Sequence, residues 1–349
     1  CSLDDPAGTP QPIPVGWQSG HHPGGRKRFS RFALRAGLRS LRRRPDLIWS
    51  THINLLPPAL LSGVPYWGIG HGFEAWQPRH RYLGSVLKRA RRLQGVSRMT
   101  VAALAQHSGY HPPVDWLPNT VAAERFSPGP KSAPLLQRYG LRPEQPVLLT
   151  VNRLAAGEDH HPYDRVIETL PEVLRVFPDC RYLIAGSGGD RPRLESFIRS
   201  RGLERHVTLC GFVPNAELAD HYRLGDLFLM PSENEGFGIV CLEAMACGCP
   251  VLASNRDGSR DAVLNGELGL LVDPRDTGAI ARAIIRHLQG QSEHPLLYDP
   301  TGLQQRMLAE YGPERFRQRV AELIRLMPGP ILQQAGYATP SMLQLSEVG

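Results

Sequence analysis

The sequence predicts an α/β protein with two domains, each built around a parallel sheet. Short β-like runs alternate with amphipathic helical runs along most of the chain, which is typical of layered α/β domains. The chain has 349 residues, more than twice a common domain length. Its residues are 41% hydrophobic and 21% charged, which is ordinary for a folded protein and excludes a disordered or collagen-like chain.

In the first half, hydrophobic periodicity predicts a domain over residues 1–129. The predicted strands cover 47–50, 66–69 and 93–96, the predicted helices cover 29–43 and 82–92, and a loop covers 112–128. A linker around a short amphipathic helix follows at 130–146.

The second half begins with a strongly apolar strand at 147–151, which opens a second domain ending at 327. Its further strands are predicted at 182–185, 207–209, 227–230, 250–253 and 269–272. Its helices are predicted at 163–176, 192–201, 216–224, 239–246, 277–287 and 313–327. The tail, 328–349, is expected to be poorly ordered.

Positive charge is concentrated in the first half of the chain. Residues 1–140 hold 19 Lys and Arg against 6 Asp and Glu, whereas the rest holds 21 against 27. Nine of the basic residues lie in 26–44, a segment without acids whose apolar residues recur at helical spacing. Such a helix is typical of anionic membrane surfaces, and the residues expected to bind a membrane or acceptor are Arg26, Lys27, Arg28, Arg31, Arg35 and Arg39.

Two alternatives to membrane binding bear on this basic segment. Its apolar stripe also suits packing against the first sheet, in which case the charges are a solvated face. Nucleic acid is disfavoured, since no recognised nucleic-acid motif or aromatic-basic interleaving accompanies the segment.

Cysteine usage and hydropathy predict a cytoplasmic protein, peripheral on the inner membrane face if it docks there at all. The six cysteines have no disulfide-framework spacing, so free thiols in a reducing compartment are expected. The longest mostly apolar stretch, 55–70, is broken by three prolines, and no signal peptide is visible.

The densest chemical signal is the stretch 231–250, directly after a predicted buried strand. Glu235 and Glu243 lie on either side of a glycine-containing turn that opens a helix, where Gly236 and Gly238 let backbone N–H groups approach a ligand. In an open parallel sheet, ligands bind at this end of the strands. The two carboxylates are suited to accept hydrogen bonds from a diol; the alternative is that both are solvated surface residues.

Residues 235–251 resemble the E-x7-E signature of the retaining glycosyltransferase family 4, whose members have two facing Rossmann-like domains (the GT-B fold). Agreement extends over residues 26–327. The further matching segments are 45–48, 71–76, 96–100, 117–120, 150–154, 183–188, 211–222, 225–232, 257–261 and 269–274.

The resemblance implies a nucleotide-sugar donor and assigns roles to matching positions. Glu243 would bind the ribose diol and Glu235 a hydroxyl of the donor sugar, while Arg153 would hold the diphosphate. His71 would lie near the reacting carbon and the acceptor, so the expected catalytic residues are His71, Glu235 and Arg153. The remaining donor-binding positions are Gly186, Val213 and Leu218 in the matching turns, and Phe237, Gly238 and Ile239 through their backbone N–H groups.

One departure from the family concerns the charge at the leaving group. His161 falls where the family has a lysine that shares the diphosphate charge. A histidine with an ordinary pKa of about 6.5 is only partly cationic at neutral pH, so a weakened or pH-sensitive leaving-group site is expected. The alternative is that His161 is a loop histidine and that Arg191 or Arg256 supplies the charge.

The second departure is at the start of the chain. The family opens with a strand, a glycine-rich loop and a helix, and nothing before residue 26 corresponds to them. An incomplete N-terminal domain, lacking about forty residues, is therefore expected. Either the sequence is partial, or the molecule lacks the loop that meets the donor phosphate.

No cofactor or metal is expected. No Asp-x-Asp pair is present, and the carboxylate and imidazoles of Glu158, His160 and His161 fit a charged loop better than a metal site. The prediction is thus a metal-independent, retaining glycosyltransferase that acts on a polysaccharide or lipid-linked glycan. The competing hypothesis is a degenerate relative that binds a nucleotide sugar without turnover.

Overall fold

A computed structural model describes residues 45–77, 81–109, 112–156 and 162–327. Its contacts divide the chain into two compact units. The first comprises the described residues up to Gly70 together with Glu74–Gln94 and Ala102–Asp115, and the second comprises His71–Phe73, Gly95–Val101 and the described residues from Trp116 on. Each sheet is parallel, so the predicted α/β fold with two parallel sheets is confirmed.

The first sheet has four strands in the order β1-β2-β3-β4: β1 (Ile48–Ser50), β2 (Tyr66–Gly70), β3 (Arg92–Gly95) and β4 (Val114–Trp116). Its accompanying helices are η1 (Ile53–Leu55), α2 (Pro57–Ser62), α3 (Phe73–Trp76), α4 (Arg81–Arg89) and α5 (Arg98–Ser108). Leu56, Leu87 and Leu93 are fully buried in the core that these elements enclose.

Strand β4 corrects the predicted loop at 112–128. The backbone N–H of Leu93 donates to the carbonyl of Pro113 at 2.9 Å, and that of Leu117 donates to the carbonyl of Gly95 at 3.0 Å. Main-chain pairing with β3 creates this strand, and three residues are too few to show the alternation that predicts a strand from sequence.

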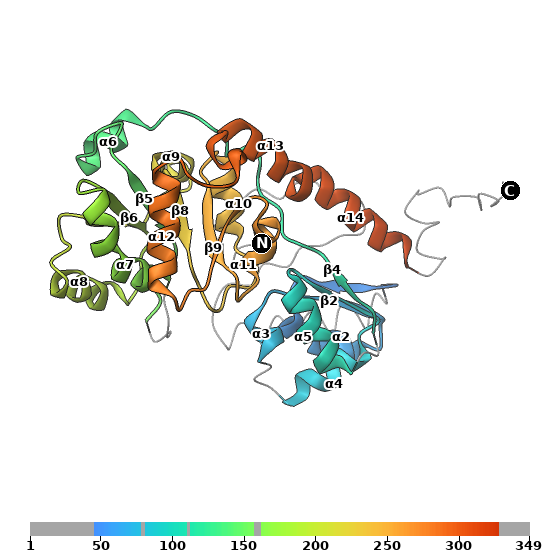
Figure 1. Ribbon diagram of the computed structural model, residues 1–349. Coiled ribbons are helices and arrows are strands. Elements are labelled where there is room, and N and C mark those ends of the chain that lie inside the picture. The colour runs from blue at the N-terminus through green and yellow to red at the C-terminus, as the bar shows by residue number, and fades with distance from the viewer. Residues whose placement is uncertain (1–44, 78–80, 110–111, 157–161, 328–349) are drawn as a thin grey trace, which may run out of the picture. The chain divides into compact units, whose positions relative to one another are not determined.

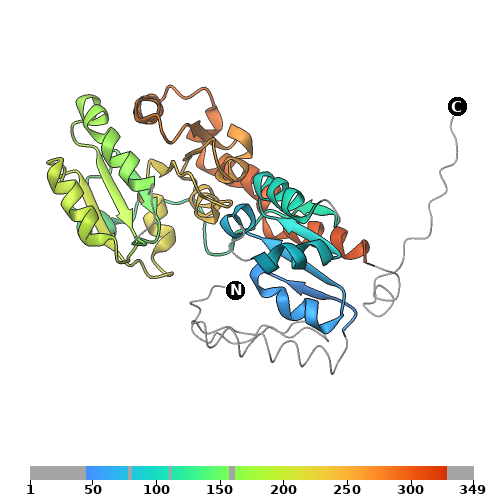
Figure 2. The same cartoon turned by 90° about the horizontal axis from the view of Figure 1, so that it is seen from below.

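The second sheet has six strands in the order β10-β9-β8-β5-β6-β7 (Figures 1 and 2). Two sets of three strands run outward from the β5–β8 pair, which is the doubly wound order with a topological switch point at its centre. The strands are β5 (Val147–Val151), β6 (Arg181–Ala185), β7 (Val207–Gly211), β8 (Leu227–Met230), β9 (Val251–Ser254) and β10 (Gly269–Val272).

Helices cover both faces of this sheet (Figure 1). One face packs on α7 (Pro162–Val176), α8 (Arg191–Ser200) and α12 (Thr277–Leu288). The other contacts α9 (Leu218–Leu224) and α10 (Ile239–Ala246), while α11 (Ser259–Ala262) and η2 (Leu264–Gly266) lie between β9 and β10 in the chain. Burial on both faces explains why these strands read as continuous apolar runs.

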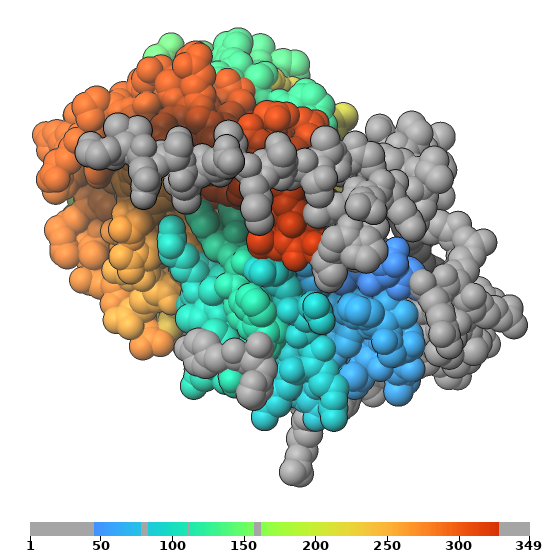
Figure 3. Space-filling view, turned by 90° about the vertical axis from the view of Figure 1, so that its right-hand side faces the viewer, coloured from blue at the N-terminus to red at the C-terminus, as the bar shows by residue number. Residues whose placement is uncertain are grey.

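Three further elements follow α12: η3 (Pro295–Tyr298), α13 (Pro300–Tyr311) and α14 (Pro313–Arg325). Helix α13 was not predicted, although its start carries two ordinary signals. Pro300 occupies the first turn, and the Asp299 carboxylate accepts the N–H of Gly302 at 3.0 Å. Figure 3 shows α13 and α14 at the surface.

The segment 130–146 contains the expected short helix, α6 (Ala133–Tyr139). Its side chains bond to the second unit: Lys131 Nζ donates to Asp226 Oδ2 at 2.8 Å, and Tyr139 Oη lies 2.9 Å from His221 Nε2. This segment is therefore built into the second unit, while the predicted domain boundaries stay predictions.

Two sequence expectations concern the membrane. In the part of the chain that the structure describes, no helix is both long and apolar enough to cross a bilayer. The basic segment with Arg26, Lys27, Arg28, Arg31, Arg35 and Arg39 lies outside the described residues.

Candidate functional site

The predicted donor site lies at the carboxyl edge of the second sheet, at its switch point. Strands β5 and β8 are hydrogen-bonded neighbours in parallel register, with Leu149 opposite Phe228. The loop after β5 carries Arg153, and the loop after β8 carries Glu235. Both residues therefore leave the same edge of the sheet, where open α/β folds bind ligands.

The Glu235 side chain turns back to the backbone at the start of α10. Glu235 Oε1 accepts the backbone N–H of Gly238 at 3.0 Å and, more weakly, that of Phe237 at 3.5 Å. Gly238 has φ +86, and an added Cβ would lie 2.6 Å from Cε of Met230. The left-handed backbone and the close approach of Met230 both favour glycine at position 238.

Asp257, in the loop after β9, contacts the backbone of the Glu235 loop. Its Oδ2 accepts the backbone N–H of Glu235 at 3.0 Å, and its Oδ1 accepts the backbone N–H of Ser259 at 3.0 Å. Burial raises the pKa of the Glu235 carboxyl, and the nearby charge of Asp257 raises it further. Burial also raises the pKa of Asp257, against the hydrogen bonds that it accepts.

Asp257 is not among the site residues predicted from the sequence. A signal was present, since Asp, Gly and Ser at 257–259 directly follow a buried strand of the same sheet. What the sequence does not show is that this loop and the Glu235 loop touch.

Glu243 lies in the second turn of α10 and is half-buried. Its Oε2 accepts a 2.7 Å hydrogen bond from the hydroxyl of Tyr222, a fully buried residue of α9. Burial raises the pKa of Glu243, whereas the Tyr222 hydroxyl and the charge of Arg125 lower it. Tyr222 is thus a contact of Glu243 that the predicted set lacks.

Arg153 is exposed, and it makes no hydrogen bond or ion pair with the residues that the structure describes. The two alternative sources of charge differ from it. Arg191 Nε donates to Glu195 at 2.7 Å, and Arg256 makes two bonds to Asp273, at 2.8 and 2.6 Å. Among these three arginines, Arg153 alone presents an unpaired guanidinium within the described chain.

The remaining predicted donor residues of the second unit fall into two groups. Gly186 has φ +150, and a Cβ there would lie 1.8 Å from the carbonyl oxygen of Asn152, so it lets two loops touch. Phe237 is buried against the Tyr311 ring, whereas Ile239 is exposed. Val213, after β7, and Leu218, the first residue of α9, are half-buried.

Two predicted residues remain. His71 directly follows β2, at the carboxyl end of a strand of the first sheet, and is half-buried. It belongs to the second unit, and a Cβ at Gly236 would lie 1.7 Å from its carbonyl oxygen, so the structure brings His71 against the Glu235 loop. His161 lies outside the described residues.

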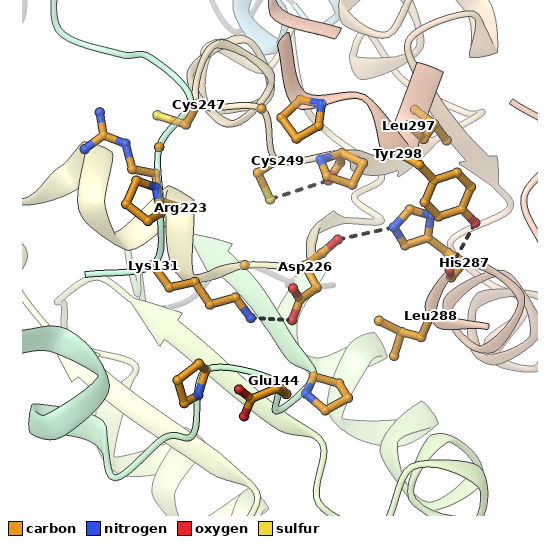
Figure 4. A pocket seen from close by; sticks show the side chains of 18 residues that line it. Lys131, Glu144, Arg223, Asp226, Cys247, Cys249, His287, Leu288, Leu297 and Tyr298 are labelled. Atoms are coloured by element: carbon orange, nitrogen blue, oxygen red, sulfur yellow. Dashed lines mark hydrogen bonds and ion pairs between the residues drawn. The ribbon is translucent and has the colours of Figure 1, made fainter. Parts of the chain in front are cut away.

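A cavity of about 580 Å³ lies at the opposite, amino-terminal edge of the second sheet (Figure 4). Its polar groups bond to one another: Asp226 accepts Lys131 Nζ at 2.8 Å, and its backbone oxygen lies 3.2 Å from Nε2 of His287. The His287 ring in turn stacks on Tyr298, with 5.0 Å between ring centroids. The residues that line this cavity do not include the Glu235 loop, so it is separate from the predicted donor site.

Within the described ranges, no group of three or more His, Cys, Asp and Glu side chains is placed to hold a metal ion. The acidic residues of the site instead bond to a tyrosine, to serines and to backbone N–H groups.

Known proteins resemble this chain in sequence. Residues 134–302 match the family described as Glycosyl transferases group 1. A GDP-mannose-dependent alpha-(1-6)-phosphatidylinositol monomannoside mannosyltransferase of Mycolicibacterium smegmatis is 36% identical over 197 residues, 54% of this chain and 50% of the relative. A D-inositol 3-phosphate glycosyltransferase of Geodermatophilus obscurus is 31% identical over 281 residues, 74% of this chain and 61% of the relative. The chain thus spans about half to three fifths of these relatives.

Solved structures share the fold over a longer stretch. Sucrose-phosphate synthase from Thermosynechococcus elongatus has a TM-score of 0.71 at 22% identity, covering 86% of this chain and 78% of that one. Anabaena Alr3699/HepE, solved with UDP and glucose, has a TM-score of 0.70 at 19% identity, covering 85% and 81%. The predicted relationship to glycosyltransferases is confirmed by the match of residues 134–302 to the Glycosyl transferases group 1 family, and Arg153, Glu235 and Glu243 lie within the matched residues.

Proposed function

We propose that this protein moves a sugar from a nucleotide-sugar donor to a glycan or lipid-linked acceptor, with retention of anomeric configuration. The observation that carries the proposal is the arrangement at the carboxyl edge of the second sheet. Two carboxylates, Glu235 and Glu243, lie on one loop and helix, and the unpaired Arg153 lies on the loop after the neighbouring strand.

The leaving group in such a transfer is a nucleoside diphosphate, whose developing negative charge must be stabilised. The Arg153 guanidinium is available for it, and α10 begins at this edge with Ile239, whose backbone N–H belongs to the first turn, whereas the N–H of Gly238 is donated to Glu235. A helix N-terminus with a glycine-containing turn favours phosphate oxygens. On this proposal protein groups stabilise the charge and no metal is required, so activity should persist in EDTA.

The carboxylates suit the neutral parts of the donor. The Tyr222 hydroxyl donates one hydrogen bond to the Glu243 carboxylate. The carboxylate can accept further hydrogen bonds, which suits it to the two hydroxyls of a ribose. Glu235 is proposed to accept a hydroxyl of the donor sugar. In the free protein its carboxylate accepts the N–H of Gly238, which fixes its orientation.

Relatives suggest which compounds to test. The names of two relatives include GDP-mannose, phosphatidylinositol monomannoside and D-inositol 3-phosphate. We propose GDP-mannose as the first donor and these inositol compounds as the first acceptors, with His71 near the acceptor. A cytoplasmic location at an anionic membrane remains part of the proposal, and sedimentation with phosphatidylglycerol vesicles against phosphatidylcholine vesicles tests it.

The decisive experiment incubates the full chain with GDP-mannose or UDP-glucose and each acceptor. Release of GDP or UDP is followed by chromatography, and the anomeric configuration of the product by NMR coupling constants. Transfer with retention is expected, and E243Q should raise the donor KM about tenfold or more, whereas the exposed control E195Q should not.

Three outcomes would contradict the proposal. Binding of GDP or UDP without transfer or donor hydrolysis would favour a binding protein. An inverted product would overturn retention, and loss of activity in EDTA would overturn metal independence.

A further inference from the structure

We propose that Asp257 is a positioning residue for the transfer reaction, which holds the backbone of Glu235 so that its carboxylate meets the donor sugar. This inference rests on the proposed function. Asp257 lies in the loop after β9, whereas Glu235 lies in the loop after the neighbouring β8. Asp257 therefore acts on the donor through Glu235.

The hydrogen bonds of Asp257 are divided evenly between its two oxygens. Oδ2 accepts the backbone N–H of Glu235 at 3.0 Å and the hydroxyl of Ser232. Oδ1 accepts the backbone N–H of Ser259 at 3.0 Å and its hydroxyl at 2.6 Å. Asp257 is only 5% exposed, so these four donors satisfy a carboxylate that water barely reaches.

A second set of contacts holds the same two loops together. The backbone N–H of Gly258 donates to the carbonyl of Glu235 at 2.8 Å. A Cβ at Gly258 would lie 2.0 Å from the carbonyl oxygen of Gly236, so the two backbones pack without room for a side chain. The position of Glu235 is therefore set from the β9 loop through Asp257 and Gly258.

Asp257 also acts on Glu235 through its charge. Among the described residues, the charge of Asp257, from the β9 loop, raises the pKa of Glu235, and the buried thiol of Cys241, from α10, interacts electrostatically with the Glu235 carboxylate. The backbone N–H groups of residues 236–238 oppose them by lowering the pKa of Glu235. Removing the Asp257 charge should therefore lower the pKa of Glu235, which a purely structural role would not do.

Asp257→Asn is a sharp test, because asparagine keeps the shape but has one acceptor oxygen. A serine hydroxyl can rotate and accept a hydrogen bond from the asparagine NH2 group, whereas a backbone N–H can only donate. Each carboxylate oxygen accepts one backbone N–H, so either orientation of the amide leaves the N–H of Glu235 or that of Ser259 facing an NH2 group.

The experiment compares full-length wild type, D257N and the exposed control D179N. Calorimetry gives the Kd of GDP and of GDP-mannose, and kcat/KM is measured as a function of pH. For D257N we expect GDP affinity within threefold of wild type, which also reports a folded domain. The contribution of the sugar to affinity, measured as the Kd of GDP divided by the Kd of GDP-mannose, should fall at least fivefold. The kcat should fall ten- to hundredfold. The acid limb of the pH profile should move to lower pH.

A milder variant covers the possibility that D257N does not fold. Ser232→Ala removes one bond between the loops but keeps the charge and both backbone acceptors, so kcat should fall while the acid limb stays in place. A D257N protein with wild-type kcat and an unmoved acid limb would overturn the inference. If wild type transfers no sugar, the proposed function fails; an unchanged Kd ratio in D257N would by itself refute the positioning role.

Discussion

The hydroxyl of Tyr222 donates a 2.7 Å hydrogen bond to Oε2 of Glu243, and this bond connects α9 to α10 beside the proposed donor site. Tyr222 is fully buried and packs edge-on against Phe126, with 6.0 Å between ring centroids. The ring cannot turn freely, so the hydroxyl fixes one rotamer of the carboxylate. Glu243 is thus held in one orientation in the free protein.

Tyr222→Phe should therefore weaken nucleoside binding while leaving the chemical step intact. A hydrogen bond to a charged group contributes about 1.5–3 kcal/mol, so the Kd of GDP and the donor KM should rise about tenfold or more. Calorimetry and steady-state kinetics measure both. Tyr298→Phe, at the opposite edge of the same sheet, is the matched control and should change neither.

Glu235 should destabilise the fold at neutral pH. Its pKa is raised by burial and by Asp257, so the folded protein binds this proton more tightly than the unfolded chain does. The stability that protonation brings is complete below the unfolded pKa of about 4.3 and is lost as the pH rises through the raised folded value. E235Q should therefore raise Tm at pH 8, with the gain shrinking towards pH 4, while donor turnover falls.

Glu217 provides the control of opposite sign. A hydrogen bond from Arg138 lowers the pKa of this exposed carboxyl, so its charge favours the folded state above the unfolded pKa. E217Q should leave Tm unchanged or slightly lower at pH 8. If E235Q changes Tm equally at pH 8 and at pH 4, burial of the Glu235 charge is not the cause of the change in stability.

The sequence predicts the strands of the second sheet well because both faces are buried. Leu148 packs on one face and Leu149 on the other, so the strand reads as one apolar run. The three-residue β4 carries no such pattern, and its existence depends on backbone pairing with β3.

The residues of the candidate site also differ in whether the local sequence reveals them. Glu235 and Glu243 are visible in the sequence because their spacing, the glycines and the preceding strand are local. Asp257 and Tyr222 are recognisable only when the loops after β8 and β9, and the helices α9 and α10, are seen together. That Arg256 is paired with Asp273 while Arg153 is not likewise follows from tertiary contacts.

Arg153→Ala should act mainly on the chemical step. The unpaired guanidinium is proposed to stabilise the leaving diphosphate, and removing one such preorganised donor typically costs 10²- to 10³-fold in kcat. Arg256→Ala removes an arginine already bonded to Asp273, so its kcat should stay within about threefold of wild type. Comparable losses in the two variants, measured as GDP release at saturating donor, would remove the special role of Arg153.

Gly238→Ala should lower the free energy of unfolding for two reasons, a strained left-handed backbone and a steric clash. Gly238 has φ +86, and the added Cβ would lie 2.6 Å from Cε of Met230, whereas Gly202 has φ +65 with nothing within 4 Å of an added Cβ. G202A therefore measures the cost of the left-handed backbone alone, about 1–2 kcal/mol.

G238A should lower the free energy of unfolding by more than G202A does, since the flexible Met230 side chain must move to accept the methyl group. It should also displace the N–H that Glu235 Oε1 accepts. Turnover should then fall at least tenfold in G238A and remain unchanged in G202A, as measured by urea unfolding and GDP release. Equal losses of stability with full activity in both would mean that the turn at 235–238 tolerates a side chain and does not fix Glu235.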